Sequence, residues 1–350
     1  MTPEAREQTV LEAVRKRREL VNDAVETDLP ITEPERLYEA SRYLLDAGGK
    51  RLRPAMLLLT GEAILDVEPL TEDYRDFPTL VDDEPPIDLM KAAVSVEVIQ
   101  SFTLIHDDIM DQDEMRRGVP AVHVQYDPET AILAGDTLYS KAFEIMIESG
   151  APPDRAIEAL DTLASTCTRI CEGQSLDVDF ETRPTVETDE YLDMIDRKTA
   201  VLYAASSAIP AILLGADEET QQALTEYGRT VGKAFQIHDD VLDLTVPSED
   251  LGKQRGSDLV EGKRTIITLH AREHGVDVEN LVEAETPEAV TEAAITDAVA
   301  TLEDAGSIEY ARSLASEYVE EGKDYLQVLP DSEARTRLEQ VADYLIDRGY

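Results

Sequence analysis

A seven-residue segment that occurs twice is the strongest constraint on this chain. The copies occupy residues 105–111 and 237–243, and both read Ile-His-Asp-Asp, two aliphatic residues and Asp. On a helix, residues four apart lie on one face, so the first and last aspartates of a copy share a face with the middle one at its flank. Each copy therefore predicts a helical turn with three clustered carboxylates. These are Asp107, Asp108 and Asp111 in the first copy and Asp239, Asp240 and Asp243 in the second.

Carboxylates packed this closely repel one another unless a cation neutralises them, and hard divalent cations, Mg²⁺ above all, are the usual partners. Mg²⁺ is normally held by one or two carboxylates plus substrate phosphates, which predicts a phosphorylated small molecule as the third component. A single copy in a chain with 75 acidic residues would be interpreted as solvated helix surface. The duplication, and the apolar residues 94–105 and 231–236 that precede the copies, favour metal sites.

Apolar residues recur with the helical period through most of the chain, and strand-like alternation is scarce. With 350 residues, 42% of them hydrophobic, and no Pro/Gly/Ser-rich linker, we expect an all-α fold forming one domain over 1–350. An acidic surface loop without a chemical role is expected at about 66–87. The most apolar stretch, Ala200 to Ala216, contains Pro210 and is shorter than the about 20 residues of a membrane span. It predicts a buried helix and no transmembrane segment.

The net charge of −43 argues against nucleic acid and anionic membranes as partners, because both would be repelled. Our hypothesis is a halophilic protein, adapted to a cytoplasm whose salt screens self-repulsion; the Debye length is about 3 Å at 1 M salt. Residues 1–7 are charged and lack an apolar signal region, which predicts a cytoplasmic location.

Clustered cations in so acidic a chain indicate anion binding. Residues 48–54, Gly-Gly-Lys-Arg-Leu-Arg-Pro, place three cations within four residues, and Arg116-Arg117-Gly118 follows the first acidic cluster. Further cations are Lys198, Lys253, Lys263 and Arg264. Arginine matches phosphate oxygens bidentately, and lysine supplies a point charge. The alternative for Arg116 and Arg117 is surface pairing with Asp113 and Glu114.

This inventory predicts two phosphate sites. Lys50, Arg53 and Arg117 would hold one diphosphate without metal. The six aspartates with Mg²⁺ would hold the other, together with Arg116, Lys198 and Lys253. No residue set suggests a covalent nucleophile. The expected chemistry is metal-assisted departure of diphosphate, leaving an electron-poor carbon that a second substrate attacks in a pocket that excludes water.

Seven motifs occur in order along the chain: G-G-K-R-L-R-P at 48–54, H-D-D-I-M-D at 106–111, R-R-G at 116–118, G-D at 135–136, G-Q-x-x-D at 173–177, K-T at 198–199 and F-Q-I-H-D-D-V-L-D at 235–243. Over residues 48 to about 264 the chain thereby resembles the trans-type isoprenyl diphosphate synthases, in particular the archaeal geranylgeranyl diphosphate synthases. The resemblance implies an isoprenoid-synthase-type helical bundle around a central substrate cavity, active as a homodimer. It also implies head-to-tail condensation of isopentenyl diphosphate with C5 to C15 allylic diphosphates, with about three Mg²⁺ ions per active site when substrate is bound.

The resemblance also implies individual roles. The most direct metal ligands would be Asp107, Asp111 and Asp243, supported by Asp108, Asp239 and Asp240. The allylic diphosphate would contact Arg116, Lys198, Gln236 and Lys253, with Lys263 as a further substrate-binding cation. Isopentenyl diphosphate would contact Lys50, Arg53, Arg117 and Gln100. Thr199 and Gln236 would lie near the developing carbocation, where hydroxyl and amide dipoles stabilise positive charge. Gln174 and Asp177 match a further helix that faces the site.

Product length is predicted from the helix that precedes Asp107. Each added C5 unit extends the tail by about one helical turn, whose rise is about 5.4 Å. Ile99, Phe102 and Thr103 are expected on the cavity side. Thr103 is too small to stop the tail, whereas Phe102 is bulky, and its position matches the aromatic residue associated with a C20 product in archaeal relatives. We predict geranylgeranyl diphosphate as the product, farnesyl diphosphate as an intermediate, and C25 as the nearest alternative.

Two other functions compete with this interpretation. A class I terpene cyclase also ionises an allylic diphosphate with Mg²⁺, but it needs no second diphosphate site, so Lys50, Arg53 and Arg117 weigh against it. Cyclases also usually replace the second acidic cluster by an Asn/Ser/Glu pattern. A non-catalytic regulatory subunit or acidic cation-binding protein would be expected to have lost metal ligands or basic residues, and none is missing.

Overall fold

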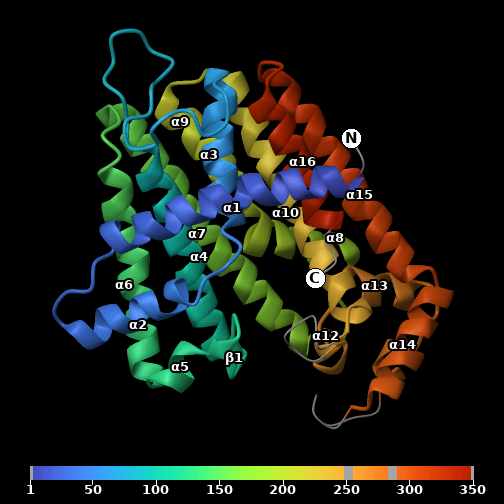
Figure 1. Cartoon of the computed structure of the whole chain (residues 1–350). Coiled ribbons are helices and arrows are strands. Elements are labelled where there is room, and N and C mark those ends of the chain that lie inside the picture. The colour runs from blue at the N-terminus through green and yellow to red at the C-terminus, as the bar shows by residue number, and fades with distance from the viewer. Residues whose placement is uncertain (1–2, 248–254, 283–289, 348–350) are drawn as a thin grey trace. The chain divides into compact units, whose positions relative to one another are not determined.

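The regular secondary structure of the computed structural model is almost wholly helical (Figure 1). The structure describes residues 3–247, 255–282 and 290–347, with side chains from residue 11 onward. The α-helices are α1 Pro3–Asp28, α2 Glu35–Asp46, α3 Leu52–Leu65, α4 Leu89–Met110, α5 Val122–Gln125, α6 Pro128–Ile147, α7 Pro153–Thr182, α8 Thr188–Ile195, α9 Val201–Leu214, α10 Glu218–Thr245, α12 Ser257–Val260, α13 Ile266–Glu273, α14 Glu292–Asp304, α15 Ser307–Tyr325 and α16 Glu333–Asp347. Shorter helical turns are η1 Asp196–Ala200, η2 Val278–Asn280 and η4 Leu326–Val328.

Strand structure within the described residues is confined to a small hairpin and one bridge. The hairpin pairs β1 Met115–Arg116 with β2 Val119–Pro120 in antiparallel fashion, and Phe77 bridges to Ile87. The predicted all-α fold is confirmed. The segments on either side of the motif-bearing residues 48–264 include α1 at one end and α14 to α16 at the other.

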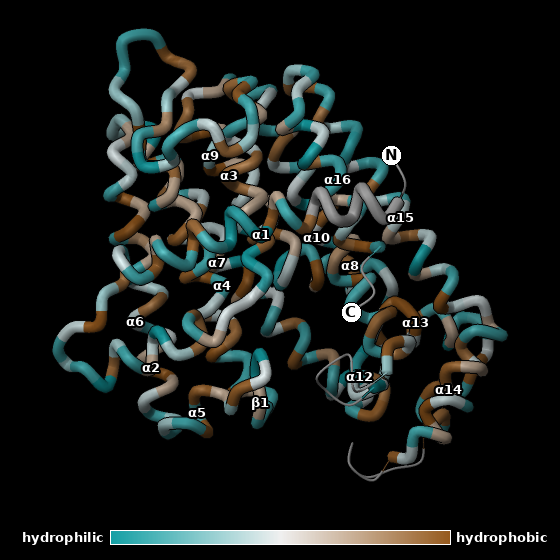
Figure 2. Tube along the Cα trace, in the orientation of Figure 1, coloured by the Kyte–Doolittle hydropathy of each residue, from teal (hydrophilic) through white to brown (hydrophobic). Residues whose placement is uncertain are grey.

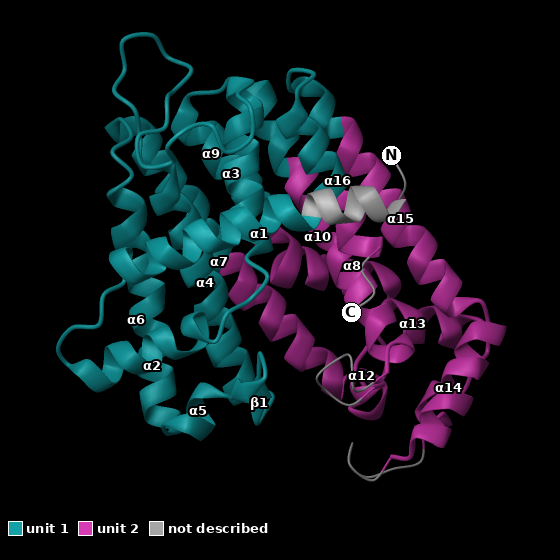
Figure 3. Ribbon diagram, viewed as in Figure 1, with its two compact units in different colours: residues 1–167, 204–225, 325–341 teal, residues 168–203, 226–324, 342–350 magenta. Residues whose placement is uncertain are grey.

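The chain groups into two compact units, each made of several segments (Figure 3). Unit 1 contains Met1–Cys167, Ala204–Thr225 and Tyr325–Val341; unit 2 contains Thr168–Tyr203, Glu226–Asp324 and Ala342–Tyr350. Along the helices of both units, hydrophobic and hydrophilic positions alternate (Figure 2). The first acidic cluster belongs to unit 1 and the second to unit 2. The expectation of one domain over 1–350 stays a prediction.

Helix α4 is the central element of unit 1 and packs against α6, α3 and α1. It begins at Leu89, where the Asp88 side chain accepts a hydrogen bond from the Lys91 backbone N–H at 3.0 Å and satisfies a donor that the first turn leaves open. Most of its residues up to Ile105 are buried, on every face of the helix. A helix that is apolar all round is stable only inside a core. Its last turn carries the first acidic cluster.

The segment 66–88, predicted over about 66–87 as an acidic surface loop, is a mostly exposed loop that three buried side chains anchor to unit 1. Tyr74, Phe77 and Ile87 are buried, and Phe77 and Ile87 exchange two backbone hydrogen bonds of 2.8 Å. The Tyr74 hydroxyl donates to Glu62 of α3 at 2.5 Å, and Glu62 also pairs with Arg17 of α1. Because acidic residues dominate the composition of this segment, its sequence does not indicate that the aromatic residues are buried.

Helix α8, η1 and α9 follow one another without a break in the chain. In η1, a single π-helical turn, the Val201 N–H bonds to the Asp196 carbonyl, five residues back. Helix α9 is buried along its length and contains Pro210, which confirms the predicted buried helix. Among the described helices, none has both the length and the apolar character that crossing a membrane requires.

Candidate active site

The first acidic cluster lies at the C-terminal end of α4, with Asp107 and Asp108 in the last turn and Asp111 as the C-cap, and this turn carries no basic residue. Asp107 is half-buried, Asp108 buried and Asp111 exposed. The backbone dipoles of a helix place partial negative charge at its C-terminal end, so the position adds to the repulsion among the carboxylates. A cation bound at this end would neutralise both the carboxylates and the negative end of the helix dipole. The placement therefore fits the predicted metal site.

Asp108 is held by Arg116, with Nε and Nη2 of the arginine 2.6 and 2.5 Å from Oδ1. The other oxygen, Oδ2, is buried and has no hydrogen-bond partner among the described residues. Burial raises the pKa of Asp108 to about 6, although Arg116 opposes the shift. A buried carboxylate oxygen without a donor fits a hard cation. Arg116 also pairs with Asp113 at 2.8 Å, which is the surface pairing considered as an alternative.

The second cluster lies near the end of α10, where Asp239 is half-buried and Asp240 and Asp243 are buried. Asp243 accepts hydrogen bonds from the Ser257 hydroxyl at 3.0 Å and from the Asp258 N–H at 3.2 Å, both at the start of α12. In both clusters the second aspartate is buried and tied to protein, and the first reaches solvent. The direct ligands predicted from the resemblance include the buried Asp243 and exclude the more accessible Asp239, so the division of roles stays a prediction.

A chain of hydrogen bonds in unit 2 links the predicted carbocation-stabilising pair to the second cluster. The Thr199 hydroxyl donates to Oε1 of Gln236 at 2.8 Å, and Nε2 of Gln236 donates to Oδ1 of Asp240 at 3.2 Å. The buried Tyr191 hydroxyl donates to Oδ2 of Asp240. Burial raises the pKa of Asp240 well above its usual range. Tyr191 was not predicted, because no sequence signal relates it to a residue 49 positions away.

The G-Q-x-x-D motif of α7 meets the K-T motif. Lys198 Nζ lies 2.5 Å from Oδ2 of Asp177. The side-chain amide of Gln174 is buried, and neither its nitrogen nor its oxygen finds a hydrogen-bond partner in the part of the chain that the structure describes. A buried amide without a protein partner is expected to form hydrogen bonds with a ligand or a bound water. The expectation that this helix faces the site stays a prediction.

In unit 1, the glycine turn at 48–49 and the R-R-G motif meet around Arg117. Its Nη1 donates to the carbonyl oxygens of Leu44, at 3.0 Å, and Gly48. Gly49 has a φ of +145°, and a Cβ there would lie 2.9 Å from Cζ of Arg117. Only glycine accommodates both the backbone angle and the guanidinium. The structure thus brings together the two motifs predicted to form one phosphate site, with Lys50 exposed and Arg53 half-buried.

Glu97 of α4 is a functional candidate that the prediction missed. It accepts a hydrogen bond from the buried Arg51 and lies 3.4 Å from Nη2 of Arg117. Arg51 also donates to Asn22 at 3.0 Å and to the Leu45 carbonyl at 2.6 Å. One of the three cations counted in the basic motif is therefore structural. The available signal was a single glutamate within the apolar stretch 94–99.

Phe102, the predicted chain-length residue, packs within a row of aromatic rings. The Phe102 ring lies 5.0 Å from the ring of His106 and 5.3 Å from that of Tyr139 on α6, and Tyr139 lies 5.2 Å from Phe143. A Cβ on Gly135 would approach Nε2 of His106 to 2.2 Å, so the G-D motif makes room for this imidazole. Of the neighbouring positions, Ile99 is buried, while Gln100 and Thr103 are half-buried. Their orientation toward the prenyl tail stays a prediction.

Two predicted cations remain. Lys263 lies 3.1 Å from Glu261 and 3.6 Å from Asp258, whereas Lys253 lies outside the described residues. Over residues 3–247, 255–282 and 290–347, no three histidine, cysteine or acidic side chains gather into a preformed metal cage. Mg²⁺ commonly uses one or two carboxylates plus substrate phosphates, so the predicted sites do not require such a cage.

Comparison with known proteins agrees with these observations. The all-α fold, the two aspartate-rich turns and the convergent basic motifs are those of a prenyltransferase. The sequence profile of polyprenyl synthetase matches residues 34–302, and the chain belongs to this family of prenyl diphosphate synthases.

Three relatives are informative. The geranylfarnesyl diphosphate synthase of Natronomonas pharaonis is 65% identical and covers 97% of each chain. A solved geranylgeranyl pyrophosphate synthetase from Geoglobus acetivorans is 44% identical, with a TM-score of 0.84 over 96% of this chain and 99% of that one. A polyprenyl synthase structure from Caulobacter crescentus, complexed with calcium and isoprenyl diphosphate, is 30% identical, with a TM-score of 0.82 over 98% of both chains.

Proposed function

We propose that this enzyme is a Mg²⁺-dependent geranylgeranyl diphosphate synthase. It condenses isopentenyl diphosphate head-to-tail with C5, C10 and C15 allylic diphosphates and stops at C20. The observation that carries the product length is Phe102, five residues before Asp107 and held between the rings of His106 and Tyr139. A ring packed on two sides is a firmer stop for a growing tail than an unsupported one, because moving it disrupts both contacts.

Each acidic cluster contributes metal ligands in this proposal. Asp107 and Asp111 in unit 1, and Asp239 and Asp243 in unit 2, are the candidates, with Asp108 and Asp240 in support. The buried Oδ2 of Asp108 and the calcium in the Caulobacter crescentus relative support a divalent cation. When bound, Mg²⁺ stabilises the negative charge that develops on the departing diphosphate.

The remaining roles belong to side chains of this chain. Arg116 and Lys198 neutralise the allylic diphosphate, while Lys50, Arg53, Arg117 and Gln100 hold isopentenyl diphosphate. Arg117 is well suited to this task, because two backbone carbonyls and Glu97 hold its guanidinium in place before substrate binds. The Thr199 hydroxyl and the Gln236 amide direct their dipoles at the positive charge on the allylic carbon.

A C25 product is the second candidate. It is favoured by the 65% identity to the geranylfarnesyl diphosphate synthase of Natronomonas pharaonis, whereas the Geoglobus acetivorans relative is a geranylgeranyl pyrophosphate synthetase. The lengths differ by one C5 unit, or about one helical turn of tail. The two candidates share all chemistry and differ only in where growth ends.

Product analysis tests the proposal. The protein is incubated with labelled isopentenyl diphosphate, Mg²⁺ and each of the C5, C10 and C15 primers, and the hydrolysed products are sized. We expect C20 to dominate with every primer and C15 to appear transiently. Dominant C25 would replace our product with the second candidate. Absence of elongation with all three primers, or full activity in the presence of excess EDTA, would refute the proposed reaction or its metal dependence.

We also propose that the enzyme acts as a cytosolic homodimer. Helix α6 exposes Ile132, Leu133, Tyr139 and Ile147, whose exposed fractions run from 38% to 59%. Ile132, Tyr139 and Ile147 recur at helical spacing and form an apolar stripe that a second copy of the chain would cover. Light scattering should give twice the subunit mass of 38.8 kDa. A monomer at assay concentration would exclude the dimer as the active form.

A further inference from the structure

Asp196, the first residue of η1, is a buried carboxylate surrounded by three cations. Its oxygens lie 2.6 Å from Nη2 of Arg169 on α7, and 3.2 Å from both Nη1 of Arg229 and Nζ of Lys233 on α10. Asp196 is 6% exposed. A buried charge persists only when it is paired, and removing one member of such a group is costly. These ion pairs fasten the start of η1 to two helices at once.

The π-helical turn that begins at Asp196 changes which way the following side chains point. A π turn holds one residue more than an α turn, so everything after it is rotated by about 100° relative to an unbroken α-helix. Lys198 meets Asp177 on α7, and the adjacent Thr199 meets Gln236 on α10. Two neighbouring residues thereby reach two different helices.

Two glycines allow the backbone of η1 to lie directly against these helices. A Cβ on Gly173 of α7 would lie 2.3 Å from the backbone nitrogen of Lys198, and a Cβ on Gly232 of α10 would lie 2.6 Å from Cα of Ala200. Contacts this short with backbone atoms cannot be relieved by rotating a side chain. The turn is therefore held between α7 and α10 by direct packing as well as by charge.

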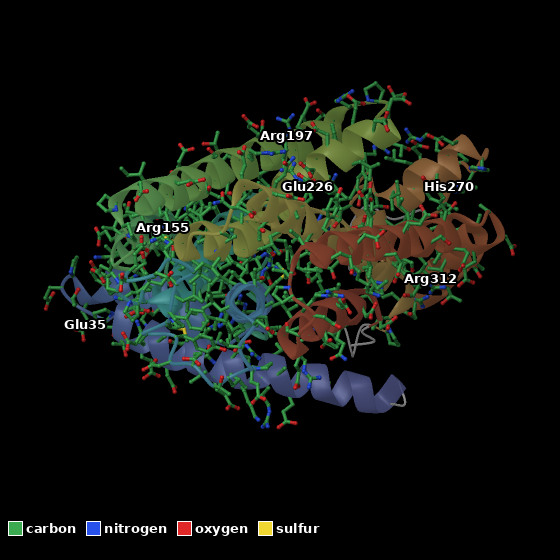
Figure 4. The ribbon with its side chains drawn as sticks, turned by 90° about the horizontal axis from the view of Figure 1, so that it is seen from above. Glu35, Arg155, Arg197, Glu226, His270 and Arg312 are labelled. Atoms are coloured by element: carbon green, nitrogen blue, oxygen red, sulfur yellow. The ribbon has the colours of Figure 1, made fainter. Side chains whose placement is uncertain are left out.

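We infer that Asp196 is a positioning residue for prenyl transfer: its three ion pairs lock η1 between α7 and α10 and so set where Lys198 and Thr199 present Nζ and Oγ1. This inference rests on the proposed function. The next residue, Arg197, labelled in Figure 4, does not share the role, because its partners Asp193 and Glu172 are about half exposed. Exposed ion pairs of that kind contribute little to holding a backbone.

The test compares Asp196→Asn with Asp193→Asn. Both substitutions remove one negative charge from neighbouring turns at nearly constant volume, but Asp193 is exposed and pairs only with Arg197 among the described contacts. Steady-state kinetics are measured for both substrates well below the unfolding midpoint of each variant, with circular dichroism as the check on folding.

For Asp196→Asn we expect kcat to fall about 10- to 100-fold and the allylic KM to rise, because a displacement of about 1 Å at a reacting group costs up to about 100-fold in rate. The KM for isopentenyl diphosphate should stay within about twofold, and Asp193→Asn should leave all three parameters within about twofold.

Two further variants keep the inference falsifiable if Asp196→Asn does not fold. Gly173→Ala displaces Lys198 without touching Asp196 and should reproduce the kinetic pattern. Asp196→Glu retains the charge and should recover part of kcat. If Asp196→Asn and Gly173→Ala lower only the unfolding midpoint, Asp196 merely stabilises the fold and the inference is wrong. A wild-type protein without prenyl transfer would instead refute the proposed function.

Discussion

Lys198 donates from Nζ to Oδ2 of Asp177 at 2.5 Å, and both side chains are 25% exposed. The ion pair fixes the direction of the ammonium, and its partial exposure leaves room for an anionic ligand beside it. On unit 1, Arg117 is held in a comparable way by Glu97 and two backbone carbonyls. Each proposed phosphate site thus contains a cation that is positioned before substrate arrives, which reduces the ordering that binding must supply.

Kinetic separation of the two phosphate sites follows from this arrangement. Lys50→Ala and Arg117→Ala should chiefly raise KM for isopentenyl diphosphate, about 10-fold or more for a lost charged contact. Lys198→Ala should raise the allylic KM and lower kcat. Initial rates with each substrate varied in turn make the comparison. Indistinguishable defects in all three variants would contradict the assignment.

The acidic clusters are tested by removing one carboxylate from each. Asp107→Ala and Asp243→Ala should lower turnover by about 100-fold or more, because they remove stabilisation of the leaving group. Asp161→Ala is the matched control, since Asp161 is an exposed carboxylate on α7 outside the site. Turnover is measured at saturating Mg²⁺, and circular dichroism checks the fold. A near wild-type rate in either cluster variant would remove that aspartate from the metal site.

The chain-length prediction concerns Phe102. Phe102→Ala should shift the products to C25 and longer, because it opens the space that the ring fills beside Tyr139. Phe77→Ala is the control: it truncates another buried phenylalanine of unit 1 and should cost about 3–5 kcal/mol of stability without changing product length. Chromatography of the hydrolysed products decides the outcome. If Phe102→Ala still releases only C20, Ile99 or a residue of a partner subunit sets the limit.

Acid should weaken the fold through His270, labelled in Figure 4. Its ring lies between those of His274, at 4.0 Å, and Tyr310, at 4.3 Å. Burial and then the charge of His274 lower the pKa of His270 below its usual 6.5. The folded state therefore binds fewer protons than the unfolded chain, so this contribution to stability is complete above pH 6.5 and is lost as pH falls through the lowered pKa.

The measurement is the unfolding midpoint at about pH 7.5 and about pH 5.5. The raised pKa values of Asp108 and Asp240 act in the opposite sense on the midpoint, so the prediction concerns the difference between proteins. Acidification should lower the midpoint of the wild type relative to that of His270→Gln. His123→Gln, a histidine of unit 1, serves as the control and should respond to acidification as the wild type does. The same response in His270→Gln and the wild type would contradict the assignment.

Salt dependence tests the halophilic hypothesis. With a net charge of −43, the folded protein should lose stability on transfer from about 2 M to about 0.05 M KCl, because the Debye length grows and self-repulsion is no longer screened. Far-ultraviolet circular dichroism follows the helices. Unchanged helical signal and midpoint at low salt would show that the acidic composition has another cause.

Much of the site was predictable because its signals are local. The helical class follows from the period of apolar residues, and the acidic turns follow from aspartates four positions apart, which share a face on any helix. The structure places the glycine turn at 48–49 against Arg117, but the phosphate site predicted for Lys50, Arg53 and Arg117 stays a prediction. The composition of segment 66–88 does not predict the burial of Tyr74 and Phe77, because that burial depends on partners elsewhere in the fold.

The sequence by itself thus determined that the chain is helical, that it carries two carboxylate turns, and that cations accompany them. Each of these properties depends only on residues that are close together in the sequence. Only the tertiary structure decided which charges act on ligands and which hold the protein together. Arg51 turns inward to Glu97, Tyr191 reaches Asp240, and Asp196 collects cations from two helices. These pairings join residues 27 to 49 positions apart. The directions of Lys198 and Thr199 also depend on a single π turn, and neither composition nor helical periodicity encodes a one-residue change of register.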